Sequence, residues 1–231
     1  GFEFKEINLT QLLKNIIDNT NISRLRISSL QPQDLNPELL EMWKNPRLSP
    51  HLHIPLQSGN NNILKKMRRR YSRDIFEKTV EFVRNSIKDV SITTDVIVGF
   101  PGENEESFED TYNICRNIKF SNMHIFPYSK RPKTSAAYFK DHIKSEVKSQ
   151  RVRKLIELSK KHKTMFEQSF NNSIRTVLWE ESYIKENKNY WSGLTDNYIK
   201  VSTQNNNNIR NTITNVKLNY ENLELTGKLI N

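Results

Sequence analysis

Apolar residues recur along this chain with two periods, one typical of helices and one typical of strands. Helical spacing, with apolar residues three and four apart, is found at residues 9–17, 74–87, 107–118 and 145–170. Apolar runs of strand length are found at residues 24–30, 51–56, 91–100 and 123–128, the third being rich in β-branched side chains. Asn36-Pro37 adds an N-cap and the first position of a short helix. This alternation predicts an α/β fold with a parallel sheet, in units too few to close an eight-stranded TIM-type barrel.

The pattern changes after Asn171-Asn172. Short alternating runs, separated by turn residues, are found at residues 174–180, 190–193, 198–203, 213–218 and 223–230. Five short strands within some sixty residues predict a small, all-β barrel of OB-like size. We therefore expect two domains, an α/β part over residues 1–170 and a β-barrel over residues 171–231.

Charge and composition narrow the function classes. The formal net charge is +10 and the sequence pI is about 9.6, which favours an anionic partner such as nucleic acid. The asparagine-rich composition, including residues 205–208, weakens this argument, because it indicates a general compositional bias. No apolar run is long enough to cross a membrane, so no membrane partner is expected. Cys115 is the only cysteine, which favours a reducing cytoplasm.

Few residues have the pattern of a catalytic or metal site. His51 and His53 lie two apart and share one face of a strand, but without a third ligand nearby they are more simply the polar lining of a cavity. His124, on the last α/β strand, has the same ambiguity. Asp95 is more informative, because a carboxylate in the middle of an apolar strand must be paired or bound to something. Cys115 lies on an apolar helix face and is interpreted as a buried hydrophobic residue. No metal site is predicted.

Residues 51–72 form a strand, a polar turn at Gln57-Ser58-Gly59 and a helix crowded with basic residues. In α/β folds the functional groups collect just past the carboxyl ends of the strands. The simpler interpretation is a barrel strand followed by a solvated helix, since charge runs usually face water.

Three motifs occur in order: HLHIPLQSGNNNILKKMRRRY at residues 51–71, TTDVIVGFPGENEESFEDT at residues 93–111 and HIFPYSKRPKTSAA at residues 124–137. Together they closely resemble the radical S-adenosylmethionine methylthiotransferases. GLTDNYIKV at residues 193–201 resembles the branch that acts on threonylcarbamoyladenosine in tRNA. The resemblance implies a partial TIM-type radical SAM barrel, followed by an RNA-binding β-barrel of the TRAM type. It also implies methylthiolation at C2 of that nucleoside, next to the anticodon.

The cofactors implied by the resemblance are S-adenosylmethionine and two [4Fe–4S] clusters. The family's cluster-binding cysteines are absent, and Cys115 alone cannot replace them. The chain therefore resembles the downstream part of such an enzyme and is expected to be inactive by itself, with no catalytic residue assigned.

The resemblance maps the S-adenosylmethionine contacts onto strand ends. These expected cofactor-binding residues are Ser29, Gln57, Ser58, Asp95, Val98, Gly99 and Phe126, with Arg69 placed to meet a carboxylate or phosphate.

The implied partners are the anticodon stem-loop of tRNA and an electron donor such as a flavodoxin or ferredoxin. Basic residues expected to bind RNA are Lys130, Arg131 and Lys133 after the last α/β strand, and Lys200 and Arg210 in the β-barrel. Two alternatives stay open. The chain could be a non-catalytic RNA-binding module with a degenerate barrel. It could also belong to a branch that acts on isopentenyladenosine in tRNA or on a ribosomal protein.

Overall fold

A computed structural model of the chain describes residues 8–230. Its helices are α1 (Leu9–Asn19), α2 (Pro37–Glu41), α3 (Asn61–Lys66), α4 (Arg73–Ser86), α5 (Glu105–Ile118) and α6 (Ser145–Gln168). Its strands are β1 (His51–His53), β2 (Ser91–Val98), β3 (Asn122–Pro127), β4 (Ile174–Lys185), β5 (Lys188–Thr195), β6 (Lys200–Gln204), β7 (Ile213–Glu221) and β8 (Glu224–Leu229). Among the described residues, none of the helices combines the length and the apolar character needed to span a bilayer.

The helix starts follow from side-chain caps. Asn8, Asn36, Ser72 and Asn104 each accept a hydrogen bond from a backbone N–H in the first turn of α1, α2, α4 and α5 respectively. Such caps satisfy backbone donors that have no partner within the helix. The capped helix predicted at Asn36-Pro37 is confirmed.

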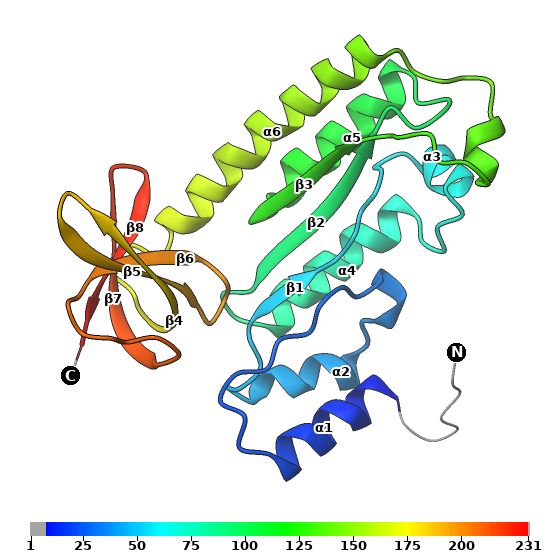
Figure 1. The fold of residues 1–231 in the computed structure, drawn as a ribbon. Coiled ribbons are helices and arrows are strands. Elements are labelled where there is room, and N and C mark those ends of the chain that lie inside the picture. The colour runs from blue at the N-terminus through cyan, green and yellow to red at the C-terminus, as the bar shows by residue number, and fades with distance from the viewer. Residues whose placement is uncertain (1–7, 231) are drawn as a thin grey trace.

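The α/β part contains a parallel sheet with strand order β1-β2-β3, which confirms the predicted class (Figure 1). The strand predicted over residues 24–30 is wrong, because this segment forms only isolated bridges, Leu25 to Leu48 and Ser29 to His53. Its residues still run parallel beside β1, so they extend the sheet without forming a regular ladder.

The first motif folds differently from the prediction in two places. The strand predicted over residues 51–56 ends at His53. Ile54 still donates its N–H to Thr93 O, but the Leu56 N–H bonds to the Thr94 hydroxyl and the Gln57 N–H bonds to Asp95 O, so the regular ladder is lost. Gln57 then takes a left-handed backbone conformation, with φ 64°, and bridges to Val96. The predicted basic helix ends at Lys66, and Arg68 turns the chain with φ 57°.

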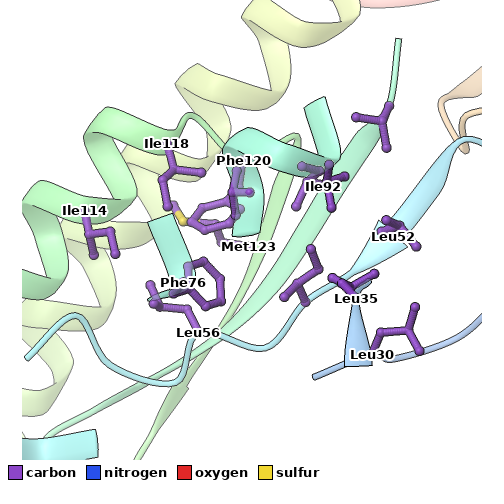
Figure 2. Close-up of a cluster of buried hydrophobic side chains, with 14 of the residues drawn as sticks. Leu30, Leu35, Leu52, Leu56, Phe76, Ile92, Ile114, Ile118, Phe120 and Met123 are labelled. Carbon is purple, nitrogen blue, oxygen red and sulfur yellow. The ribbon is translucent and has the colours of Figure 1, made fainter. Parts of the chain in front are cut away.

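The α/β core lies on one face of the sheet (Figure 2). Alternate residues of β2 point into it, and Ile92, Val96 and Val98 are almost fully buried. Phe76 of α4 and Phe108 of α5 are completely buried against this face. The intervening residues of β2 are only half-buried, which leaves the opposite face available for a site.

The C-terminal strands close into a barrel with strand order β4-β5-β6-β8-β7. The five predicted strands are therefore confirmed. The barrel surrounds its own core, in which Trp179 and Val216 are fully buried. Helix α6 joins the two cores: Leu155 packs in the first, while Phe166 and Phe170 at the end of the helix and just beyond it pack in the second.

Polar contacts attach the barrel to the α/β part beside the start of β2. Arg24 donates hydrogen bonds to the backbone oxygens of Leu194 (2.9 Å) and Thr176 (3.2 Å). Asn197 Nδ2 donates to the backbone oxygen of Asp89 (3.1 Å), and Arg175 forms an ion pair with the Asp89 carboxylate (2.8 Å). Contacts from several elements thus fix the orientation of the barrel.

Candidate functional site

The half-buried face of β2 supports two adjoining cavities. Thr93, Asp95 and Ile97 lie on this face, because side chains alternate along a strand. One cavity, of about 580 Å³, lies past the carboxyl ends of the strands, and the other, of about 260 Å³, lies between the sheet and the barrel. Asp95 lines the first cavity, while Thr93, one step toward the strand start, lines the second.

The sheet register brings two histidines to the Asp95 carboxylate. Asp95 pairs directly with His124 of β3, and His53 lies at the end of β1 beside Thr93. His53 Nε2 lies 3.2 Å from Asp95 Oδ2, and His124 Nδ1 lies 3.2 Å from Asp95 Oδ1. The two imidazole rings are stacked, with centroids 5.6 Å apart. We call His53, Asp95 and His124 the His-Asp-His cluster.

A chain of hydrogen bonds extends from this cluster to the barrel. His53 Nδ1 lies 2.9 Å from Thr93 Oγ1, which lies 3.4 Å from His51 Nε2. Arg26 Nε donates to His51 Nδ1 at 3.2 Å, and the Arg26 guanidinium lies over the ring of Tyr198, 4.5 Å from its centroid. Because a guanidinium can only donate, His51 carries its hydrogen on Nε2.

Burial keeps the His51 imidazole neutral. Loss of water contact, assisted by the positive charge of Arg26, lowers the pKa of His51 to about 4. The residue is only 4% exposed, so water does not screen these effects.

We predict that His51 makes the fold sensitive to acid. The unfolded chain keeps an ordinary histidine pKa near 6.5, so between pH 6.5 and pH 4 the unfolded state takes up the proton first. This contribution to stability is complete above pH 6.5 and is lost progressively as pH falls, by up to about 3 kcal/mol at pH 4. Urea unfolding at pH 7.5, 5.5 and 4.5 measures the slope, which His51→Gln should flatten. The exposed His142→Gln is the control, and equal slopes in the two variants would contradict the assignment.

The cavity at the strand ends has the lining of a small-molecule site. Gln57, Asp95 and Phe126 line it together with Tyr128 and Arg131. Gln57 is buried and holds a left-handed backbone conformation, which is uncommon outside glycine. Phe126 is half exposed, so one ring face is available for stacking. The volume of this strand-end cavity and its mixed polar and apolar lining suit a nucleoside-sized ligand.

The other expected cofactor contacts lie elsewhere. Ser58 is fully buried and its hydroxyl lies 3.3 Å from that of Thr111 in α5, while the Val98 side chain points into the core. Gly99 has φ 72° and donates its N–H to Glu103 Oε1 at 2.9 Å. Ser29 is exposed, and its backbone forms an isolated parallel β-bridge with His53. The Arg69 backbone N–H bonds to Leu64 O. Burial raises the pKa of Tyr71 to about 12, and the positive charge of Arg69 opposes that rise.

The basic residues expected to bind RNA are all exposed. Arg131 lines the strand-end cavity, and Lys130 and Lys133 lie in the same loop. Lys200 lines the cavity between sheet and barrel, and Arg210 lies on a barrel loop.

The barrel's aromatic residues divide between core and surface. Trp179 and Trp191 are buried, whereas Tyr183 and Tyr190 stack with ring centroids 5.7 Å apart, and Tyr183 is exposed. Tyr198 contacts Arg26 and His51. Of these rings, Tyr183 is the exposed one and is available for stacking on an unpaired base.

The residues present do not fit an iron–sulfur cluster. Such clusters need several thiolate ligands, and this chain has one cysteine. Cys115 is fully buried in α5, and burial raises its pKa to about 12, so it remains a thiol. The structure thus agrees with the interpretation of Cys115 as a core residue.

The sequence did not reveal the His-Asp-His cluster as a unit. Spacing along the sequence pairs His53 with His51 and leaves Asp95 and His124 as separate single candidates. The signal that joins them is the register of three parallel strands, in which Asp95 stands opposite His124. Strand register is fixed by tertiary packing and cannot be read from spacing within one strand.

Comparisons with known proteins match most of the chain. The Radical SAM superfamily matches residues 4–115. A threonylcarbamoyladenosine tRNA methylthiotransferase from Bacillus subtilis is 38% identical over 204 residues, which cover 87% of this chain and 45% of the relative. A tRNA-2-methylthio-N(6)-dimethylallyladenosine synthase from Finegoldia magna is 31% identical over 228 residues, which cover 97% of this chain and 49% of the relative. The chain spans about half the length of the curated relatives it matches.

The fold also matches a solved structure. Coproporphyrinogen III oxidase from Escherichia coli, described as a radical SAM enzyme, superposes with a TM-score of 0.56 at 17% identity. The match covers 69% of this chain and 38% of that chain, and it shows likeness of fold alone. The resemblance drawn from the three motifs is therefore confirmed: this chain is a relative of the radical S-adenosylmethionine tRNA methylthiotransferases.

Proposed function

We propose that this chain supplies the outer part of an S-adenosylmethionine pocket and an RNA-binding surface to a tRNA methylthiotransferase. The observation that carries the proposal is the strand-end cavity, where Gln57, Asp95 and Phe126 meet beside the basic loop of Lys130, Arg131 and Lys133. A cofactor cavity and a phosphate-binding loop on one edge of a sheet suit an enzyme that modifies a nucleoside within RNA. The relatives named above support the reaction class.

In this proposal the residues bind and orient, and they do no chemistry by themselves. The Phe126 ring stacks on the adenine, while the Gln57 amide and the Asp95 carboxylate hydrogen-bond to polar groups of the cofactor. S-adenosylmethionine, when bound, supplies methyl and radical chemistry to a transferase of this kind. The cluster that starts this chemistry, and any second cluster, need cysteines other than the single one of this chain. A flavodoxin or ferredoxin is the proposed electron donor.

The finer assignments belong to the same proposal. We propose a division into residues 1–170 and residues 171–231, with the closed barrel acting as a TRAM-type, OB-like RNA grip. The motif at residues 193–201 and the Bacillus subtilis relative support threonylcarbamoyladenosine as the nucleoside. A matching relative from the dimethylallyladenosine branch keeps that substrate as the second candidate.

A non-catalytic RNA-binding module is the other candidate function, favoured by the single buried cysteine. Both candidates require RNA binding. Only the enzyme requires the cofactor cavity, so calorimetry with S-adenosylmethionine on the complete enzyme, with and without Phe126→Ala, distinguishes them.

We expect the chain to bind an anticodon stem-loop RNA with strong salt dependence. Changing Lys130, Arg131 and Lys133 together to alanine should weaken binding at least about tenfold and reduce the salt slope by about three, if each residue contacts one phosphate. Filter binding at several salt concentrations measures both quantities. A second variant, Lys200→Ala with Arg210→Ala, tests the barrel surface separately.

A charge-matched control is available on the far helices. Lys14, Lys78 and Lys88 are exposed on or beside α1 and α4, and changing them to alanine removes the same net charge. This control should retain nearly all of the affinity. If it weakens binding as much as the loop variant, or if the loop and barrel variants bind unchanged, the basic surface acts only through net charge or is merely solvated.

A further inference from the structure

We propose that the His-Asp-His cluster is a binding site for one divalent transition-metal ion, with Zn²⁺ as its best-fitting occupant. His53, Asp95 and His124 are the group of potential ligands that the described residues bring together, and their ligand atoms all lie within 4.8 Å of one another. Two imidazoles and one carboxylate are ligands that zinc and similar ions take in catalytic and open sites. This inference goes beyond the proposed function, because the site contains no thiolate and is distinct from an iron–sulfur centre.

The ligand atoms lie near the spacing of a metal site. A metal with bonds of about 2.0–2.1 Å holds adjacent tetrahedral ligands roughly 3.3 Å apart. Asp95 Oδ2 lies 3.2 Å from His53 Nε2, Asp95 Oδ1 lies 3.2 Å from His124 Nδ1, and one ligand atom from each residue lies within 4.8 Å of the others. Because the two contacts use different carboxylate oxygens, a bound ion requires the three side chains to draw closer together.

A second layer of side chains already orients His53. A histidine ligand commonly donates its other ring N–H to an oxygen, which fixes both its tautomer and its ring plane. Thr93 Oγ1 lies 2.9 Å from His53 Nδ1 and accepts that hydrogen when Nε2 binds a metal. The hydrogen on His51 Nε2 is directed at the same Thr93 hydroxyl from the other side, with the two heavy atoms 3.4 Å apart.

The surroundings leave room for a fourth ligand. The cavity of about 260 Å³ between sheet and barrel is lined by His53 and His124, so water can complete the coordination. Three cations line this cavity: Lys163 pairs with Glu167 at 3.7 Å, Arg26 lies over the Tyr198 ring, and Lys200 is exposed to solvent. The His124 side chain is 52% exposed, which provides an entry path.

The test is titration of the untagged, metal-free chain with Zn²⁺ by calorimetry, and with Co²⁺ by its visible absorption. We expect one equivalent to bind, with cobalt bands typical of tetrahedral N/O coordination. His124→Asn and Asp95→Asn each remove a proposed ligand and should weaken binding at least about 100-fold. Thr93→Val removes only the hydroxyl that orients His53. Loss of such a supporting group typically costs roughly 10–100-fold in affinity, and about tenfold is expected here.

His124→Asn guards against misfolding, because that side chain is half exposed and its loss leaves the core intact. The control is His142→Gln, an exposed imidazole in another loop, which should bind Zn²⁺ like the parent chain. Zinc should also raise the melting temperature of the parent and the control but not of His124→Asn. Binding that survives His124→Asn, or that falls equally in His142→Gln, would overturn the proposal, as would the absence of saturable binding in the parent.

Discussion

Replacing Arg151 by methionine is expected to lower the free energy of unfolding by about 3–5 kcal/mol, because it leaves a buried carboxylate without its cation. Arg151 of α6 is 5% exposed and donates to Glu103 Oε1 at 2.7 Å and to the Glu103 backbone oxygen at 3.0 Å. Glu103 is fully buried, and its Oε1 also accepts the Gly99 N–H. Burial raises the pKa of Glu103, and the neighbouring Arg151 opposes that rise.

The destabilisation caused by Arg151→Met should increase as pH rises. A carboxyl with a raised pKa in the folded state favours folding while protonated and disfavours it once pH rises through that pKa. Without Arg151 the pKa of Glu103 rises further, so the destabilisation should be larger at pH 8 than at pH 5. Urea unfolding at both pH values measures it.

A matched control lies on the same helix. Arg153 is exposed, and Arg153→Met makes the same chemical change at an expected cost within about 0.5 kcal/mol. Adding Glu103→Gln to Arg151→Met should recover part of the loss, because no buried charge then remains. If Arg151→Met is no less stable than Arg153→Met, the buried pair does not stabilise the fold.

Trp179→Ala is expected to cost about 3–5 kcal/mol and to disrupt the β-barrel. Trp179 is fully buried in the barrel core, and its indole Nε1 donates to Thr214 Oγ1 at 2.8 Å. Alanine leaves a large cavity and an unpartnered hydroxyl. Thermal unfolding followed by circular dichroism measures the loss.

The control for this variant is Ile184→Ala on the same strand, where the side chain is 75% exposed. It should change stability by less than about 0.5 kcal/mol. Equal melting temperatures for the two variants would show that the barrel core does not limit the stability of the chain.

Much of the fold could be predicted from residue patterns because local physics determines it. The β-branched run at residues 91–100 became β2, and the helix with its Ser72 cap became α4. The five C-terminal strands follow from alternation alone. The predictions fail where the backbone departs from regular geometry, as at Gln57, whose left-handed conformation breaks the ladder beyond β1.

The candidate site was less predictable than the fold. Gln57, Asp95 and Phe126 do meet in one cavity, as strand-end residues of a parallel sheet should. Val98 shows the limit of that reasoning, because a shift of one residue along a strand moves a side chain from the cavity to the core. Ser58 lies in the turn after Gln57 and is buried against Thr111 of α5. The joining of His53, Asp95 and His124 required the three-strand register, which no single motif contains.

The way the barrel is attached has a consequence for how this protein can diverge. Arg24 and Asn197 bond to backbone oxygens, which are present whatever residue occupies those positions. Side chains on the facing barrel strands can therefore change over evolutionary time without altering the angle at which the barrel is held. The contacts that join two side chains, Arg175 with Asp89 and Tyr198 with Arg26 and His51, are the ones expected to co-vary among relatives. A barrel exchanged between two such proteins should keep its orientation if the partners of these contacts are transferred with it.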